Sequence, residues 1–241
     1  KAGQKVVVEG FLNGIELSCF VLLDGKSYLT LPSAKDYKRI GEGDTGLNTG
    51  GMGSISPVPF ADQEFLSKID KKIIKPTVEG IIKDKLDYVG FLFIGIIKVE
   101  NEPFVIEYNV RMGDPETQVV LPRIKNDFLE LMIKTASGKL DTITIDVDEM
   151  SYSNVVMVSG GYPEAYEKGK KITGLNKEYE SIVLHAGTKK LNNNIITSGG
   201  RVLSVISKGE DFKSALRKSY KTIESIDFEG KFFRKDLGFD L

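Results

Sequence analysis

Apolar runs in the first part of the chain alternate with turn signals, and this pattern predicts an antiparallel sheet. β-branched residues fill positions 6–8, and the pair Asn13-Gly14 separates them from the apolar run 17–23. Asp24-Gly25 is a second hairpin signal and leads into residues 27–31. Two hairpins in close order favour strands that pair with their neighbours in sequence.

From residue 62 the period becomes helical. Asp62 is the expected N-cap of a helix, because apolar residues then recur at the spacing of one buried face: Phe65, Ile69, Ile73 and Ile74. Pro76 is expected to interrupt or kink this helix, which then continues to about residue 85.

Two strong strand runs follow at residues 88–99 and 104–110. After them, the sequence predicts a helix at 127–137, then short strands at 153–159, 181–186 and 201–207, and a last helix at 211–225. The composition changes near residue 140, where acidic residues and threonines are frequent. We therefore predict an α+β fold with two domains, 1–140 and 141–241. The first is an antiparallel sheet with helices, and the second is small and mainly β.

Residues 35–59 have no apolar periodicity and contain many glycines, at positions 41, 43, 46, 50, 51 and 53. Successive backbone amides in such a stretch can surround an anion, and Lys38 and Arg39 add positive charge. The spacing matches neither a Walker loop nor a dinucleotide fingerprint. The composition alone favours a phosphate site and a flexible loop about equally.

A set of polar residues lies at the end of the run 104–110. Glu107 and Asn109 are two positions apart, so they share one face of the predicted strand. A carboxylate and an amide oxygen suit a magnesium ion that also holds phosphates. Arg111 extends this face and suits a transferring phosphoryl group. The competing interpretation is a set of surface polar residues on a half-exposed strand.

Two further segments carry candidate binding residues. Asp114 and Glu116 provide negative charge that suits an ammonium group, although Asp114 or Thr117 is equally suited to cap a following turn. Residues 9–16 predict a strand end and a chain reversal with a carboxylate at either end. Such a reversal can present backbone groups to an adenine edge, and its second carboxylate can accept hydrogen bonds from ribose hydroxyls.

Composition narrows the class of protein. The 241 residues include 33 basic and 34 acidic side chains, and this balance argues against a general nucleic-acid binder. Cys19 is the only cysteine, which excludes an intrachain disulfide framework and predicts a small buried side chain. His185 is the only histidine, and we expect it to have a structural role. No apolar run reaches the roughly 18 residues that span a membrane, so a reducing cytoplasm is expected.

Together, these segments resemble the ATP-grasp ligases, and within them the glycinamide ribonucleotide synthetase family. The likeness rests on KDYKR at 35–39, NTGGMG at 48–53, EYNVRMGDPE at 107–116, SGGYP at 159–163, HAGT at 185–188, GGRVL at 199–203 and RKDLG at 234–238. The segments follow the family's order over nearly the whole chain.

The resemblance implies a reaction in purine biosynthesis. Glycine is joined to 5-phosphoribosylamine through a glycyl phosphate, while ATP becomes ADP and phosphate. The implied cofactors are ATP and Mg²⁺ or Mn²⁺, and the implied partners are small-molecule substrates rather than a nucleic acid or a membrane. Such a reaction depends on positioning and charge neutralisation more than on a protein nucleophile.

The resemblance also implies a role for each matching position. In the family's pattern, adenine is held at Glu9 and the backbone of Leu12, ribose at Glu16, the metal at Glu107 and Asn109, and phosphate at Arg111. Lys38 and Arg39 belong to the reacting centre, and the substrate is assigned to Asn48, Thr49, Asp114 and Glu116. Many ATP-grasp enzymes carry an acidic metal ligand on the preceding strand, where this chain has residues 93–96, FIGI.

The family also has an N-terminal domain and a first ATP-grasp subdomain, which this sequence lacks. The chain begins at Lys1, only a few residues before a strand-like run. We therefore expect a fragment with negligible ligase activity unless an N-terminal half complements it. A non-catalytic binding half and an ATP-grasp ligase for another carboxylate and amine are the alternative interpretations.

Overall fold

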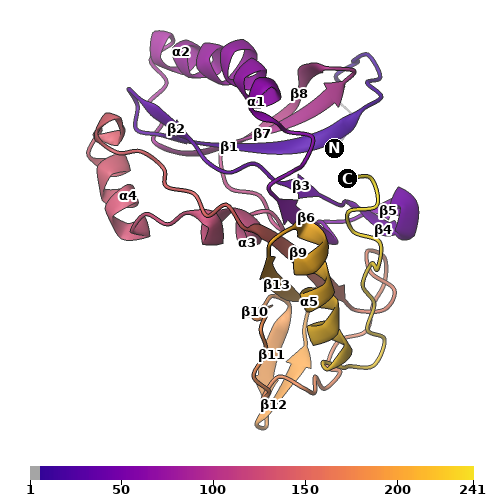
Figure 1. Ribbon diagram of the computed structural model, residues 1–241. Helices are drawn as coiled ribbons and strands as arrows, with labels where there is room; N and C mark the ends of the chain where they lie inside the picture. Colours follow the sequence, from indigo (N-terminus) through magenta and orange to yellow (C-terminus); the bar gives the residue numbers. More distant parts are fainter. Residues whose placement is uncertain (1–5) are drawn as a thin grey trace.

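The computed structural model describes residues 6–241 and contains two antiparallel sheets of four and five strands (Figure 1). The first sheet has the order β2-β1-β7-β8, built from β1 (Ile15–Leu23), β2 (Tyr28–Thr30), β7 (Gly90–Val99) and β8 (Glu102–Asn109). All of its pairings are antiparallel. The predicted fold class, an antiparallel sheet with helices and then a mainly β region, is confirmed.

Two helices cover one face of this sheet (Figure 1). α1 (Gln63–Ile69) begins at Asp62, whose side chain accepts a hydrogen bond from the Phe65 amide as predicted. The α-helix is interrupted just before Pro76 by a π-helical turn, Asp70–Ile74, and helical backbone continues through it into α2 (Lys75–Lys83). Pro76 lies in the first turn of α2, where a proline costs little.

The two faces of the first sheet have different neighbours. Alternate residues of β1 and β7 pack under α1 and α2: Leu17, Cys19, Val21, Leu23, Leu92, Ile94 and Ile96. Burial raises the pKa of the Cys19 thiol to about 12, as expected for an inert core side chain. On the other face, Phe20 and Phe93 pack against α3 (Thr117–Val120) and α4 (Phe128–Ala136). The remaining end of that face carries polar side chains, including Glu16 and Ser18.

The second sheet contains strands from both ends of the chain. Its order is β10-β13-β9-β6-β3, built from β3 (Lys35–Asp36), β6 (Gly53–Ser56), β9 (Ser151–Val158), β10 (Ile182–His185) and β13 (Arg201–Gly209). α5 (Phe212–Glu224) packs on it. β6 pairs with β9 across the expected boundary at residue 140, so the division into 1–140 and 141–241 stays a prediction.

The stretch 35–59 is more ordered than its sequence pattern indicates. Besides β3 and β6 it forms a small hairpin, β4 (Arg39–Gly41) and β5 (Thr45–Asn48), around a short 3-10 turn. These strands are two to four residues long, too short for an apolar period to be visible. β3 pairs with β6 and β4 with β5, and β6 also pairs with the distant strand β9.

A second hairpin, β11 (Thr188–Leu191) and β12 (Asn194–Thr197), was not predicted. The strand expected at residues 6–8 is wrong, because these valines are exposed and pair with no strand in the described range. His185 bonds the hydroxyl of Thr188 through Nδ1, 2.9 Å away, in agreement with a structural role. Within residues 6–241, no helix is both long and apolar enough to cross a membrane.

Candidate functional site

An apolar cavity of about 400 Å³ lies beside strands β1, β7 and β8 of the first sheet. It is lined on one side by Ile97, Val105 and Ile106 from β7 and β8. Residues 9–12 also line it, and Glu16 of β1, which pairs with Ile97, completes the lining. The structure therefore brings together the three residues expected to hold adenosine, namely Glu9, Leu12 and Glu16.

A charged cavity of about 490 Å³ also has Glu16 in its lining. It contains side chains from the glycine-rich stretch: Lys35, Asp36, Lys38, Arg39, Asp44 and Asn48. Because Glu16 lines both spaces, they adjoin as an apolar end and a charged end. Three residues predicted for phosphate and substrate, Lys38, Arg39 and Asn48, thus lie next to the predicted ribose carboxylate.

Lys38 is at the centre of a carboxylate cluster in this charged cavity. Its ammonium group bonds Glu16 and lies 3.7 Å from Asp36. Burial opposes the charge on Lys38, but the carboxylates of Asp36 and Glu16 outweigh it and raise its pKa. Burial raises the pKa of Asp36 despite the nearby lysine. Lys38 therefore remains a cation at neutral pH.

Glu116 lies behind this cluster and is only 3% exposed. Its Oε1 accepts a hydrogen bond of 3.0 Å from the Ser18 hydroxyl. Burial and the negative charge of Asp36 raise the pKa of Glu116 to about 7. This carboxyl group therefore holds a proton over part of the neutral range.

Glu107 and Asn109 share one face of β8, as predicted. Tyr108 points to the opposite face, where its hydroxyl lies 3.0 Å from that of Thr77 on α2. Glu107 pairs with Gly95 of β7, and a Cβ at position 95 would lie 3.1 Å from the Glu107 side chain. The glycine on the preceding strand thus leaves the room that this carboxylate needs.

Arg111 continues this polar group. Its Nη2 lies 3.4 Å from Oδ1 of Asn109, and Nη1 donates to the Met112 carbonyl. The Nδ2 of Asn109 is buried and has no hydrogen-bond partner among the described residues. An orphaned amide beside an exposed carboxylate fits a polar ligand at this place. Within residues 6–241 no three His, Cys, Asp or Glu side chains are grouped for a metal, so Glu107 and Asn109 are a pair.

Two of the predicted substrate residues make contacts within the protein. Thr49 donates from its amide and its hydroxyl to the Lys38 carbonyl, which closes the hairpin that carries Lys38. Asp114 accepts hydrogen bonds from Arg201 and from the amide of Gln118, at 3.1 and 2.8 Å. The substrate roles of these two residues stay predictions.

The C-terminal segments hold the glycine-rich stretch in place, and the sequence pattern did not indicate this. Arg234 is fully buried and pairs with Asp44 at 2.5 Å and Asp236 at 2.8 Å. Tyr162 accepts a hydrogen bond from the Gly50 amide. Arg234 and Tyr162 belong to segments that carry the family resemblance. Nothing in their local sequence pattern indicates which other segment they contact.

The antiparallel sheet with its two covering helices belongs to the ATP-grasp class, since residues 1–117 match an ATP-grasp domain. A solved biotin carboxylase complex with β-γ-ATP from Campylobacter jejuni shares this fold at 14% identity, with a TM-score of 0.64 over 96% of this chain and 50% of that one.

The chain belongs to the phosphoribosylglycinamide synthetase family. Residues 1–117 match the family's ATP-grasp (A) domain, and residues 152–240 match its C domain. A solved phosphoribosylamine–glycine ligase from Thermotoga maritima is 36% identical and has a TM-score of 0.85, over 94% of this chain and 56% of that one.

Curated relatives agree with this assignment. Phosphoribosylamine–glycine ligase of Chlorobaculum tepidum is 44% identical over 98% of this chain and 56% of its own length. The bifunctional purine biosynthetic protein PUR2,5 of Pichia angusta is 47% identical over 98% of this chain and 30% of its own. The chain thus spans about half the length, or less, of these relatives.

Proposed function

We propose that this chain supplies the nucleotide- and metal-holding part of a phosphoribosylamine–glycine ligase, a carbon–nitrogen ligase of purine biosynthesis. The reaction joins glycine to 5-phosphoribosylamine, by way of glycyl phosphate, as ATP becomes ADP and phosphate. The supporting observation is that Glu16 lines both the apolar cavity and the charged cavity, in a member of this family. The proposal includes a cytoplasmic location and small-molecule substrates.

The two cavities suggest how the nucleotide lies. The adenine ring occupies the apolar end, between residues 9–12 and the side chains of Ile97 and Val105. Glu16 uses Oε2 for Lys38, so its second oxygen can accept a ribose hydroxyl. The phosphates then extend toward Lys38 and Arg39, which neutralise their charge.

Glu107 and Asn109 would hold Mg²⁺ or Mn²⁺ through their side-chain oxygens, together with the nucleotide phosphates. When bound, the metal would neutralise charge on the phosphoryl group that moves to the glycine carboxylate. Arg111 lies next to Asn109 and adds a fixed positive charge to the same region.

Asn48, Thr49, Asp114 and Glu116 are the proposed substrate residues. Asn48 lines the charged cavity directly. Thr49 and Asp114 act through the loops that they hold, because their side chains already bond other parts of the protein. Because the pKa of Glu116 is raised to about 7, part of it is ionised near neutral pH, and this carboxylate form can accept the proton that the attacking amine loses.

The relatives extend beyond the region that they share with this chain. Activity is therefore proposed for the supplemented protein, defined as this chain together with the unmatched region of the Chlorobaculum tepidum relative, either joined to it or as a separate half. This chain assayed alone is the reference.

The test is Glu107→Gln in the supplemented protein, with ADP release measured in the presence of glycine and 5-phosphoribosylamine. Loss of a charged metal ligand is expected to lower turnover by at least about a hundredfold. Glu102→Gln is the matched control, because Glu102 lies on the same strand but pairs with Lys72. Near-normal turnover of the Glu107 variant contradicts the metal assignment. ADP release with another carboxylate and amine, but not with this pair, contradicts the substrate assignment.

A further inference from the structure

One arginine from the C-terminal part of the chain contacts two separate loops of the candidate site. Arg201 begins β13, and its Nη1 donates to the Gly50 carbonyl at 2.6 Å and to the Asp114 carbonyl at 2.9 Å. Its Nη2 pairs with the Asp114 carboxylate at 3.1 Å. The same guanidinium thus joins the glycine-rich loop to the loop that follows β8.

These two loops also touch each other directly. Gly51 has a φ of +112°, and a Cβ at this position would lie 2.3 Å from Cδ of Pro115. The Pro115 carbonyl accepts hydrogen bonds from Ser54 and Asn154, at 2.6 and 3.1 Å. Arg201 therefore bonds across a close-packed junction.

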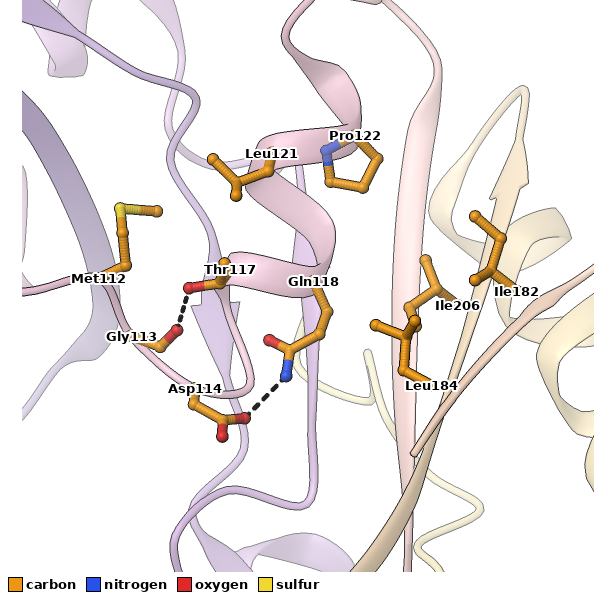
Figure 2. A pocket seen from close by; sticks show the side chains of 10 residues that line it. All are labelled: Met112, Gly113, Asp114, Thr117, Gln118, Leu121, Pro122, Ile182, Leu184 and Ile206. Carbon is orange, nitrogen blue, oxygen red and sulfur yellow. Dashed lines mark hydrogen bonds between the residues drawn. The ribbon is translucent and has the colours of Figure 1, made fainter. Parts of the chain in front are cut away.

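Further contacts fix each side of the junction. The Gly50 amide donates to the Tyr162 hydroxyl at 2.9 Å, so both polar groups of this peptide region bond the C-terminal part of the chain. On the other loop, Asp114 accepts from Gln118 of α3, the contact drawn in Figure 2. Arg201 is 24% exposed at its side chain, and bonds to two backbone carbonyls distinguish it from an ordinary surface ion pair.

The loops carry different parts of the site. The hairpin that leads into Gly50 holds Lys38 and Arg39, and the loop around Asp114 connects Arg111 with Glu116. The relative position of these four side chains therefore depends on the junction at Arg201. A lysine cannot reproduce it, because a single ammonium group lacks the planar set of donors that reaches both carbonyls and the carboxylate.

We propose that Arg201 is a positioning residue, which holds the phosphate-side loop 49–51 and the loop 113–116 in the one arrangement that the ligation requires. This inference rests on the proposed function. Arg201 acts through the loops, and its removal is expected to reduce the rate of the chemical step more than the binding of ATP. Adenosine binds at residues 9–16, which Arg201 does not contact.

The first test needs no catalysis. Hydrogen exchange is measured by mass spectrometry on peptides covering 46–53 and 112–118 in the wild type, Arg201→Ala, Arg201→Lys and Arg217→Ala. Arg217 is an exposed arginine on α5 and serves as the control. We expect exchange at least about tenfold faster in both peptides of the two Arg201 variants, since hydrogen bonds to a charged group are lost. Unchanged exchange, or a change in only one peptide, overturns the coupling of the loops.

The second test uses the supplemented protein. We expect Arg201→Ala to lower kcat by about tenfold to a hundredfold, with the KM for ATP changed less than about threefold, and free guanidinium to restore part of the rate. An equal rise in KM, or no rescue in a folded variant, overturns the positioning role. Absence of ligation in the wild type would instead contradict the proposed function, and the exchange result would still decide whether Arg201 couples the loops.

Discussion

The two walls of the candidate cleft are built in opposite ways. The charged wall, residues 35–56, is held by contacts from the C-terminal segments, including a fully buried arginine at position 234. The hinge wall, residues 9–12, lies outside the helices and strands and has no hydrogen bond to other described residues. Phe11 within it is 93% exposed. The proposed phosphate side is therefore preformed, whereas few contacts hold the proposed adenine side before a ligand is present.

This difference has a physical cause. Buried ion pairs and glycine contacts allow few arrangements of the charged wall, because each requires a defined geometry. An exposed segment with few contacts opens at low free-energy cost. Phosphoryl transfer depends on placing charges accurately, whereas an apolar cavity can form around a flat ring.

The largest expected effect comes from Arg234→Met. The change leaves the carboxylates of Asp44 and Asp236 without their buried partner, so we expect a loss of about 3 to 5 kcal/mol in unfolding free energy. Urea denaturation measures it, and Arg217→Ala serves as the surface control. A Tm and a midpoint equal to those of the wild type would show that the charged wall does not depend on this arginine.

A glycine in each wall gives a sharper comparison. Gly51→Ala introduces a Cβ at a positive φ and against Pro115, so we expect a loss of about 2 to 3 kcal/mol. Gly10→Ala in the hinge wall meets no atom within 4 Å and should change stability by less than about 0.5 kcal/mol. Equal losses measured by thermal unfolding would remove the distinction between the walls.

The charged wall should also respond to pH through Glu116. Its folded pKa of about 7 lies above the ordinary value of 4.5, so the folded protein binds the proton more tightly than the unfolded chain. Stability therefore falls as pH rises from about 4.5 to about 7 and stays lower above that range. The Glu116→Gln variant has no carboxyl group at this position, so it is expected to lack this loss of stability at higher pH.

The variant should gain about 2 kcal/mol relative to the wild type when the pH is changed from 5 to 8. Denaturant unfolding of both proteins at the two pH values gives the difference. A constant gap between them would mean that Glu116 is ionised throughout this range.

The smallest expected change in stability is that of Phe11→Ala. The side chain is almost fully exposed, so the unfolding free energy should move by less than about 0.5 kcal/mol. Because Phe11 lines the apolar cavity, ATP binding should still weaken about fivefold, as measured by calorimetry. Stability and affinity that fall together would indicate that the hinge wall is part of the core.

The sequence predicted those parts of the fold that depend on local pattern. Asp62 was recognisable as a helix cap and accepts the expected backbone hydrogen bond, and the helix predicted at 127–137 is α4. The alternation along β8 was also visible, so Glu107 and Asn109 were correctly placed on one face. Local pattern failed at residues 6–8, where three valines form no strand within the described range.

The charged wall could not be predicted in the same way. Its strands are very short, and one of them, β6, pairs with the distant strand β9. Its ion pairs also join residues that are far apart in sequence, such as Asp44 and Arg234. Arg201 and Tyr162 were visible only as parts of a family motif. Their contacts with Gly50 depend on tertiary structure, which a local pattern does not contain.

The most direct test of the account is photolabelling of the protein with azido-ATP and magnesium, followed by peptide mapping. The account predicts that the azido group on adenine labels peptides containing residues 6–14 or 97–106, and that unmodified ATP prevents this. A label that ATP does not displace, or one found in the separate apolar groove that Leu121, Ile182 and Leu184 line, would contradict the proposed position of the nucleotide.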